Sequence, residues 1–178
     1  MKREAAPGSP LGLRYGVVST PLGRFRAVTS SRGLLSVELK PDSLAALARR
    51  LERALGTPVV LKRYERDDRA PVLRQIAEYA AGKRRRFQTR LDWSLAHGFE
   101  QRVLAELAKV RFGHTLSYGE LARRAGKPGA ARAVGGAMAK NPIPLVVPCH
   151  RVLAAGGKIG GFGGGLPLKR ALLSLENA

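Results

Sequence analysis

Short runs of β-branched and aromatic residues alternate with turn residues in the first part of the chain. Residues 13–19 and 24–29 flank the segment 20–23, whose sequence Thr-Pro-Leu-Gly is typical of a turn, so they predict a β-hairpin. Residues 34–39 alternate well enough to form a third strand, and residues 59–61 a further short one. The pattern therefore predicts a small antiparallel sheet.

Two helices are expected around this sheet. The segment 41–43, with the sequence Pro-Asp-Ser, supplies a cap for a helix whose leucines recur at helical spacing. Residues 71–81 predict a second helix with Val72, Ile76 and either Tyr79 or Ala80 facing inward. The leucines of the first helix are Leu44, Leu47, Leu51 and Leu55.

The pattern changes to a mostly helical one near His97. An apolar stripe predicts a helix that ends at Phe112 and Gly113, and Ser117 has capping-box spacing to Glu120, so another helix should start at Ser117. The stripe comprises Phe99, Val103, Leu104, Leu107 and Val110. We expect an α+β chain with a flexible leader at 1–12, an α+β domain at 13–94 and a helical domain at 95–178.

The helix that starts at Ser117 and the next one, expected over residues 130–140, are joined by a glycine-containing turn. Two short helices connected in this way indicate a helix-turn-helix. The second helix consists almost entirely of alanine and glycine, with Arg132 as an isolated long side chain. Gly135 and Gly136 lower helix stability, so they indicate close approach of another backbone, either inside the protein or on DNA.

The charge of the chain points to a polyanionic partner. The 178 residues hold 32 Lys and Arg against 13 Asp and Glu, a formal net charge of +19. Such an excess attracts nucleic acid, although a basic host composition would also produce it. The basic run at 83–86 is better interpreted as a solvated turn. No apolar segment is long enough to cross a bilayer, and no signal core is present, so we expect a cytoplasmic protein.

The single cysteine is the candidate nucleophile. Cys149 leaves no partner for an intrachain disulfide and excludes a zinc site that needs several cysteines. It follows residues 145–147, which predict a short buried strand, and precedes His150. A lone cysteine is usually inert, but an imidazole can accept the thiol proton and nearby cations favour the thiolate. In an extended segment the two side chains would point apart, so contact requires a turn or a bridging water.

Glycine dominates the segment that follows the cysteine. Residues 156–165 do not match a phosphate-binding loop and are better read as a mobile or tightly turning wall beside Cys149. Pro167 then begins the last helix, with Leu168, Leu172 and Leu175 on its buried stripe. On the residues alone, Glu176 is an exposed terminal charge.

At this point the sequence resembles the O6-alkylguanine-DNA alkyltransferases. The resemblance covers residues 95–177 in unbroken order. The stretches that carry it are Ser117-Tyr118-Gly119-Glu120-Leu121-Ala122, Ala130-Ala131-Arg132-Ala133-Val134-Gly135-Gly136-Ala137-Met138, Asn141-Pro142, Pro148-Cys149-His150-Arg151-Val152, Gly164-Gly165-Leu166 and the segment from Lys169 to Glu176. The resemblance implies a ribonuclease H-like first domain and a winged-helix-like second domain.

The resemblance also implies a role for each matching position. Cys149 would accept the alkyl group, His150 would act as base through a water, and Glu176 would orient His150. Asn141 would hold the turn before Cys149, while Tyr118 would rotate the nucleotide out and protonate the guanine. Arg132 would fill the vacated stack. Further DNA contacts would come from Tyr118, Gly119, Lys127, Ala133, Gly135, Arg151 and Ala155, and the base pocket from Val147, Val152, Gly160, Phe162 and Gly163.

The resemblance implies direct-reversal repair of O6-alkylguanine in double-stranded DNA, with O4-methylthymine as a second candidate substrate. It would be a single-turnover transfer by a monomer without metal or other cofactor. Phe162 stands where the family commonly has tyrosine, Gly163 where it often has a polar residue, and His114 where an acid is frequent. His97 and His114 are expected to be surface or structural residues. A non-catalytic lesion-binding relative would lack Cys149, and a cysteine hydrolase leaves the helix-turn-helix and Arg132 without a purpose. A transcription factor would carry several polar side chains on its recognition helix, whereas this helix has essentially one.

Overall fold

The computed structural model describes residues 9–65 and 71–177. A four-stranded sheet occupies the first part, with the order β3-β2-β1-β4. Its strands are β1 (Leu11–Thr20), β2 (Gly23–Ser30), β3 (Gly33–Glu38) and β4 (Val59–Arg63). The β1–β2 hairpin forms at the predicted turn, and β1, β2 and β3 pair in antiparallel fashion.

The expectation of an antiparallel sheet is wrong for β4, which pairs parallel to β1. The chain reaches β4 after crossing the sheet through α1 (Leu44–Leu55), and such a crossover returns a strand in the parallel direction. Most of the expected leader at 1–12 lies outside the described residues. Leu11 and Gly12, which we assigned to it, instead belong to β1.

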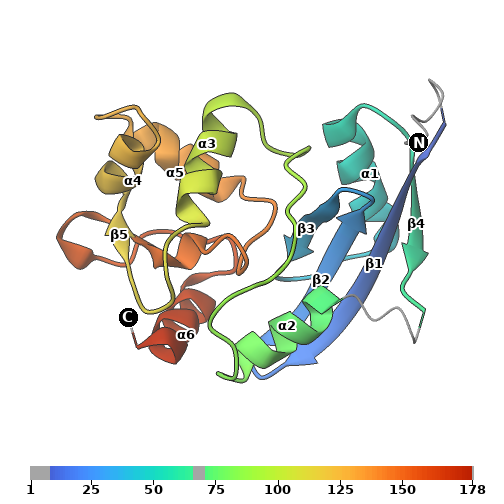
Figure 1. The fold of residues 1–178 in the computed structure, drawn as a ribbon, viewed down its shortest axis with the longest axis horizontal. Helices are drawn as coiled ribbons and strands as arrows, with labels where there is room; N and C mark the ends of the chain where they lie inside the picture. The colour runs from blue at the N-terminus through green and yellow to red at the C-terminus, as the bar shows by residue number, and fades with distance from the viewer. Residues whose placement is uncertain (1–8, 66–70, 178) are drawn as a thin grey trace.

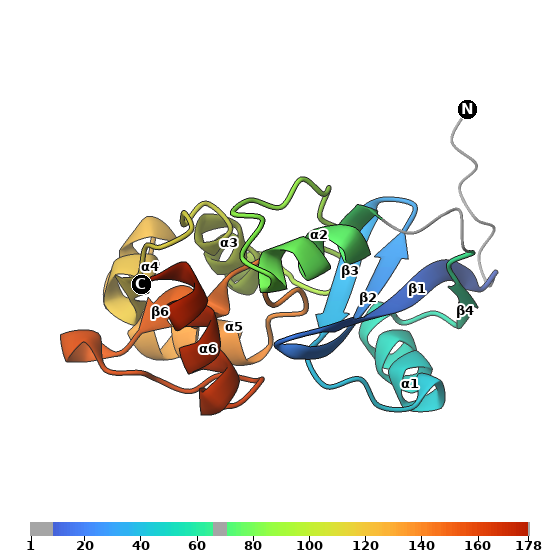
Figure 2. The ribbon, with the colours of Figure 1, turned by 90° about the horizontal axis from the view of Figure 1, so that it is seen from below.

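Two helices cover opposite faces of this sheet (Figure 2). Helix α1 begins where predicted, because the Ser43 side chain accepts a hydrogen bond from the Ala46 amide. Its buried Leu47 and Leu51 pack on one face of the sheet. Helix α2 (Pro71–Ala80) covers the other face with side chains that belong to the main hydrophobic core.

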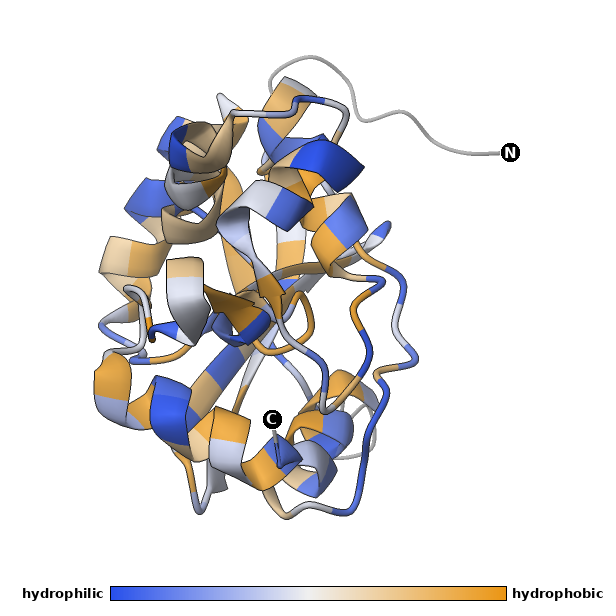
Figure 3. Cartoon of the chain, turned by 90° about the vertical axis from the view of Figure 1, so that its left-hand side faces the viewer, coloured by the Kyte–Doolittle hydropathy of each residue, from blue (hydrophilic) through white to orange (hydrophobic). Residues whose placement is uncertain are grey.

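The remaining elements form a mostly helical part (Figure 1). They are α3 (Gly98–Leu107), β5 (Leu116–Ser117), α4 (Tyr118–Arg124), α5 (Ala131–Ala139), the 3₁₀ turn η1 (Cys149–Arg151), β6 (Val152–Leu153), the 3₁₀ turn η2 (Ala155–Gly157) and α6 (Leu166–Glu176). Hydrophilic and hydrophobic residues alternate along these helices, as is typical of amphipathic helices on a core (Figure 3). The cap at Ser117 is present, with its hydroxyl accepting from the Glu120 amide.

Two local predictions in this part are wrong. Helix α3 ends at Leu107, before Val110, because the amides of Lys109 and Val110 bond to carbonyls three residues back instead of four. Residues 145–147 form a turn and not a strand. Leu145 has a φ of 72°, a left-handed conformation that interrupts an extended segment.

The main core joins the two parts of the chain. It contains Phe25 from the sheet, Ile76 from α2 and Leu172 from α6 in one cluster. A backbone hydrogen bond from the Val37 amide to the Pro142 carbonyl ties the sheet edge to the turn before Cys149. The site described next therefore rests on elements from both parts.

Candidate active site around Cys149

Cys149 is presented by a tight turn that Asn141 closes at both ends. The Asn141 side chain accepts from the Ile143 amide at 3.0 Å and donates to the Val147 carbonyl at 2.9 Å. The turn leads into η1, where Cys149 lies buried at 8% exposure. Asn141 thus holds the backbone before the cysteine.

Behind the cysteine, His150 and Glu176 meet in the interior. His150 Nε2 lies 3.0 Å from Glu176 Oε1, and both side chains are fully buried. In an extended strand the side chains of Cys149 and His150 would point to opposite sides. The two residues lie on a 3₁₀ turn, so that geometry does not arise here. His150 Nδ1 is buried and has no hydrogen-bond partner among the described residues.

Glu176 is the acceptor for a cluster of donors. The two carboxylate oxygens receive bonds from His150, from Arg151 at 2.8 Å twice, from Tyr79 at 2.5 Å and from the Gly113 amide at 3.1 Å. The reading of Glu176 as an exposed terminal charge is therefore wrong, because its side chain faces the core from the last turn of α6.

Arg151 corrects one predicted DNA contact. Its guanidinium donates to both oxygens of Glu176, and its Nη1 donates to the Val110 carbonyl at 2.6 Å. The residue is only 6% exposed. Arg151 is therefore a structural counter-charge for Glu176 and does not face a DNA surface.

Burial and hydrogen bonding shift the pKa values of the site in different directions. Burial raises the pKa of the Cys149 thiol, while a hydrogen bond from Asn141 and the charge of Lys169 oppose this shift. Burial lowers the pKa of His150 against the influence of Glu176, so the imidazole rests neutral. For Glu176, burial favours the acid, but hydrogen bonds from His150 and Arg151 prevail and hold its pKa well below the ordinary range.

Lys169 is a functional candidate that the sequence patterns did not single out. Its ammonium group is fully buried and donates to the Val152 carbonyl at 2.7 Å and to the Gly160 carbonyl at 3.2 Å. It thereby ties α6 to β6 and to the glycine-rich segment. Burial lowers its pKa, and its charge favours a thiolate at Cys149.

The residues predicted to form the base pocket differ in their contacts and in how deeply they are buried. Tyr118 begins α4, and a Cβ built on Gly160 would lie 3.1 Å from its hydroxyl, so the glycine permits this close contact. The Phe162 ring stands edge-on to His150 with centroids 6.4 Å apart. Val147 and Val152 are fully buried, whereas Gly163 is exposed.

The outer face of α5 is open. Arg132 and Ala133 are exposed, and Cβ atoms built on Gly135 and Gly136 would meet no atom within 4 Å. Internal packing therefore does not require these glycines, which removes one of the two explanations for them. The side chains on this face are small, except for the long cationic side chain of Arg132.

Other predicted contacts differ in exposure. Lys127 and Ala155 are exposed, and Gly119 is partly exposed on α4. The Lys127 ammonium lies 5.2 Å from the centre of the Phe99 ring. His97 and His114 are both exposed. Within residues 9–65 and 71–177, no cluster of three or more His, Cys, Asp or Glu could hold a metal ion, and no helix is long and apolar enough to span a membrane.

Comparison with known proteins identifies the family to which the chain belongs. Residues 98–178 match the family model described as 6-O-methylguanine DNA methyltransferase, DNA binding domain. A mouse methylated-DNA–protein-cysteine methyltransferase is 36% identical to the chain, with 92% of the chain and 81% of the relative aligned. The chain belongs to the O6-methylguanine-DNA methyltransferase family.

Bacterial relatives and solved structures give the same result. The enzyme of that name from Mycobacterium tuberculosis is 50% identical over 104 residues, which are 58% of the chain and 62% of the relative, so this match spans less than two thirds of the relative's length. The structure of M. tuberculosis OGT in complex with DNA aligns over 92% of the chain and 93% of its own, with a TM-score of 0.75 and 34% identity. The Pyrococcus kodakaraensis O6-methylguanine-DNA methyltransferase has a TM-score of 0.65 at 27% identity, over 93% and 99% of the two chains.

Proposed function

We propose that this protein repairs O6-alkylguanine in double-stranded DNA by moving the alkyl group to its own Cys149. The observation that carries the proposal is the buried Cys149 thiol next to the His150–Glu176 pair. A buried thiol beside a neutral imidazole suits a nucleophile that is activated only when a substrate fills the site.

The chemistry is an in-line displacement. The Cys149 sulfur attacks the alkyl carbon, a sulfur–carbon bond forms, and the bond from that carbon to guanine O6 breaks. The thiol proton passes through a water to His150 Nδ1, the one imidazole nitrogen left without a partner among the described residues. The Tyr118 hydroxyl supplies the proton that the departing guanine needs. The thioether product is stable, so each molecule acts once.

The alkylated base must leave the stack before this can happen. The carbon under attack lies within the duplex, and extruding a base costs a few kcal/mol, least for a damaged pair. Arg132 is exposed on α5 and can fill the vacated space. The open face at Gly135 and Gly136 allows the helix to lie close to the minor groove. Lys127, Gly119, Ala133 and Ala155 are the proposed accompanying contacts.

Two features of relatives support DNA as the partner. The matched family model is that of a DNA-binding domain, and M. tuberculosis OGT has been solved in complex with DNA. The presence of Cys149 disfavours the alternative of a non-catalytic lesion-binding protein. The resemblance to the family extends the proposal to O4-methylthymine.

The finer assignments belong to the same proposal. We assign residues 13–94 to a ribonuclease H-like domain and residues 95–178 to a winged-helix-like domain. The helical pair α4 and α5 and the small β5–β6 sheet support the second assignment. The protein is proposed to act as a monomer in the cytoplasm, associated with the nucleoid, and without metal or cofactor.

The test compares Cys149→Ala with the unchanged protein on duplexes with and without O6-methylguanine. The variant should bind both duplexes and transfer no methyl group, because the acceptor atom is missing. Arg132→Ala should reduce base extrusion more than affinity for undamaged duplex. Persistent transfer by Cys149→Ala would reject the mechanism, and equal losses by Arg132→Ala would make Arg132 an ordinary phosphate contact.

A further inference from the structure

Tyr79 is a buried residue that the proposed chemistry does not use. It lies on α2, far from Cys149 in sequence, and its side chain is fully buried. Its hydroxyl lies 2.5 Å from Glu176 Oε1 and 3.2 Å from His150 Nε2. The sheet-covering helix thus delivers a polar atom into the middle of the His150–Glu176 pair.

The contacts among Tyr79, Glu176 and His150 determine which of their atoms carry protons. The Tyr79 hydroxyl has one proton, and the short distance assigns it to the Glu176 carboxylate. The tyrosine oxygen then offers only lone pairs to His150. The two atoms nearest His150 Nε2, at 3.0 and 3.2 Å, are therefore both acceptors, so Nε2 must carry the imidazole proton.

We propose that Tyr79 is a positioning residue that fixes the tautomer of His150 with the proton on Nε2 and thereby leaves Nδ1 free to accept the thiol proton. The inference rests on the proposed function, since it concerns the same transfer. Nδ1 is the nitrogen that has no partner among the described residues. Through Tyr79, helix α2 then helps to keep His150 able to deprotonate Cys149.

The ring of Tyr79 is held so that its hydroxyl keeps this direction. The centre of the Tyr79 ring lies 5.2 Å from that of Phe87 and 6.2 Å from that of Phe112, and the Phe112 ring stands edge-on to it. Burial and the neighbouring Glu176 carboxylate both raise the pKa of Tyr79, so the hydroxyl stays protonated. Replacing only the hydroxyl leaves these ring contacts in place, which makes Tyr79→Phe a selective test.

The experiment measures single-turnover methyl transfer from an O6-methylguanine duplex across pH for the unchanged protein, Tyr79→Phe and Tyr64→Phe. Tyr64 is the matched control, because it follows β4 and its hydroxyl bonds to Thr29 of β2 at 2.5 Å, and not to any residue of the site. Tyr79→Phe should slow transfer about 10- to 100-fold, the equivalent of one lost hydrogen bond to a charged group. Its DNA affinity should not change.

The pH profile separates positioning from a general loss of structure. Without the Tyr79 donor, the Glu176 carboxylate favours a second proton on the imidazole, and that proton would occupy Nδ1, so the acid limb of the profile should move to higher pH. A merely structural defect would reduce the reacting fraction and leave the limb in place. The charged or titratable groups around His150 are Glu176 and Lys169 from α6, Arg151 and Cys149 from η1, and Tyr79 from α2.

Three results are distinguishable. A slower rate with a displaced acid limb for Tyr79→Phe alone supports the inference. A rate and profile equal to those of Tyr64→Phe overturn it. If the unchanged protein modifies no cysteine, the proposed function itself fails, and that result is read from the unchanged protein before any variant.

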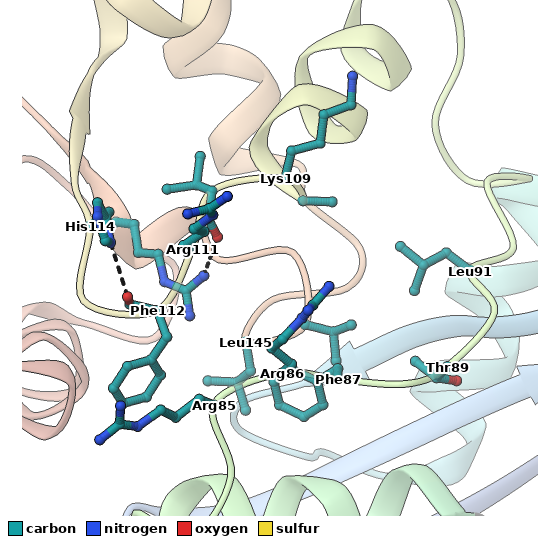
Figure 4. Close-up of a pocket in the computed structure, with 14 residues that line it drawn as sticks. Arg85, Arg86, Phe87, Thr89, Leu91, Lys109, Arg111, Phe112, His114 and Leu145 are labelled. Carbon is teal, nitrogen blue, oxygen red and sulfur yellow. Dashed lines mark hydrogen bonds between the residues drawn. The ribbon is translucent and has the colours of Figure 1, made fainter.

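An independent observation concerns a cationic cleft between the segment 85–91 and the loop after α3 (Figure 4). Its volume is about 510 Å³, and no acidic residue among those that the structure describes lines it. Arg85, Arg86 and Arg111 are exposed at this cleft, and none has a carboxylate partner in the part of the chain that the structure describes. The basic run that sequence patterns assigned to a solvated turn therefore converges with a second basic segment.

We infer that this cleft, bounded by Arg85, Arg86 and Arg111, binds the phosphate backbone of duplex DNA as a second contact surface besides α5. Arginine suits phosphate because its planar fork can donate two hydrogen bonds to one group. Phe112 stacks under Arg85, with the guanidinium carbon 5.6 Å from the ring centre, and limits its freedom. Contacts of this kind add affinity without reading sequence.

The test is the salt dependence of binding to an undamaged duplex. The variant Arg85→Gln/Arg86→Gln/Arg111→Gln should lower the slope of log affinity against log salt by about two to three, since each phosphate contact contributes about 0.9. The matched control removes the same charge from the exposed arginines of the sheet and α1, as Arg24→Gln/Arg49→Gln/Arg53→Gln. Equal slope changes in the two variants would overturn the inference.

Discussion

Replacing Glu176 with glutamine should destabilise the protein far more than its small change in shape suggests. Both carboxylate oxygens accept only from donors: His150, Arg151 and Tyr79 on Oε1, and Arg151 with the Gly113 amide on Oε2. The amide group of glutamine must therefore face at least two donors, whichever way it is turned. The guanidinium of Arg151 would also remain buried without a counter-charge.

The size of the effect follows from these losses. Breaking a buried ion pair by removing one partner costs about 3–5 kcal/mol. A domain of this size has a total stability of roughly 5–15 kcal/mol, so the loss is a large fraction of it. At about 2–4 °C per kcal/mol, the midpoint of thermal unfolding should fall by about 10 °C.

Urea unfolding of Glu176→Gln at neutral pH measures this directly. The control is Glu106→Gln, which removes the exposed pair with Lys109 at 2.5 Å and should cost about 1 kcal/mol or less. Comparable losses in the two variants would refute the reasoning, because they would mean that the Glu176 cluster is no stronger than a surface ion pair.

Further expectations follow from the same geometry. Asn141→Ala removes two hydrogen bonds of the turn before Cys149, so transfer should slow and stability should fall by about 1–3 kcal/mol, as measured by single-turnover assay and urea unfolding. Gly136→Ala should stabilise α5 by about 0.5–1 kcal/mol yet weaken DNA binding in a titration, because only an external surface opposes the added methyl. The folded pKa of His150 is lowered, so its contribution to stability is present above its unfolded pKa of about 6.5 and is lost as pH falls; His150→Gln should flatten the urea-midpoint profile between about pH 7 and pH 5.

Local signals predicted the local structure well. Ser43 and Ser117 were expected to begin helices, and both hydroxyls accept the capping hydrogen bond. The turn at 20–23 and the helix over 71–81 are also found, the latter as Pro71–Ala80. These features depend on residues within a few positions of one another, which a sequence displays directly.

The errors arise where an apolar run has two possible conformations. Residues 145–147 are as apolar as a buried strand, but the prolines at 144 and 148 remove backbone donors on either side. Asn141 then pairs with Val147 across the turn, a contact that only the folded chain makes evident. The parallel direction of β4 similarly depends on the route of the chain around the sheet.

The residues missed at the site are charged or polar groups that the fold buries. Among these, Lys169 lies on the same helical stripe as Leu172, Leu173 and Glu176, at spacings of three, four and seven, so its position on an apolar face was an available signal. Tyr79 had no such signal for a role at the site. It was expected to face inward, but its partner Glu176 lies 97 residues away along the chain.

The central claim is that Cys149 ends the reaction carrying the alkyl group. Mass spectrometry of the protein after incubation with a duplex containing O6-methylguanine tests it most directly. The account predicts one added methyl group per molecule, located on the peptide that contains Cys149, with the repaired duplex never exceeding the amount of protein. Repair in excess of the protein, or repair that leaves Cys149 unmodified, would contradict it.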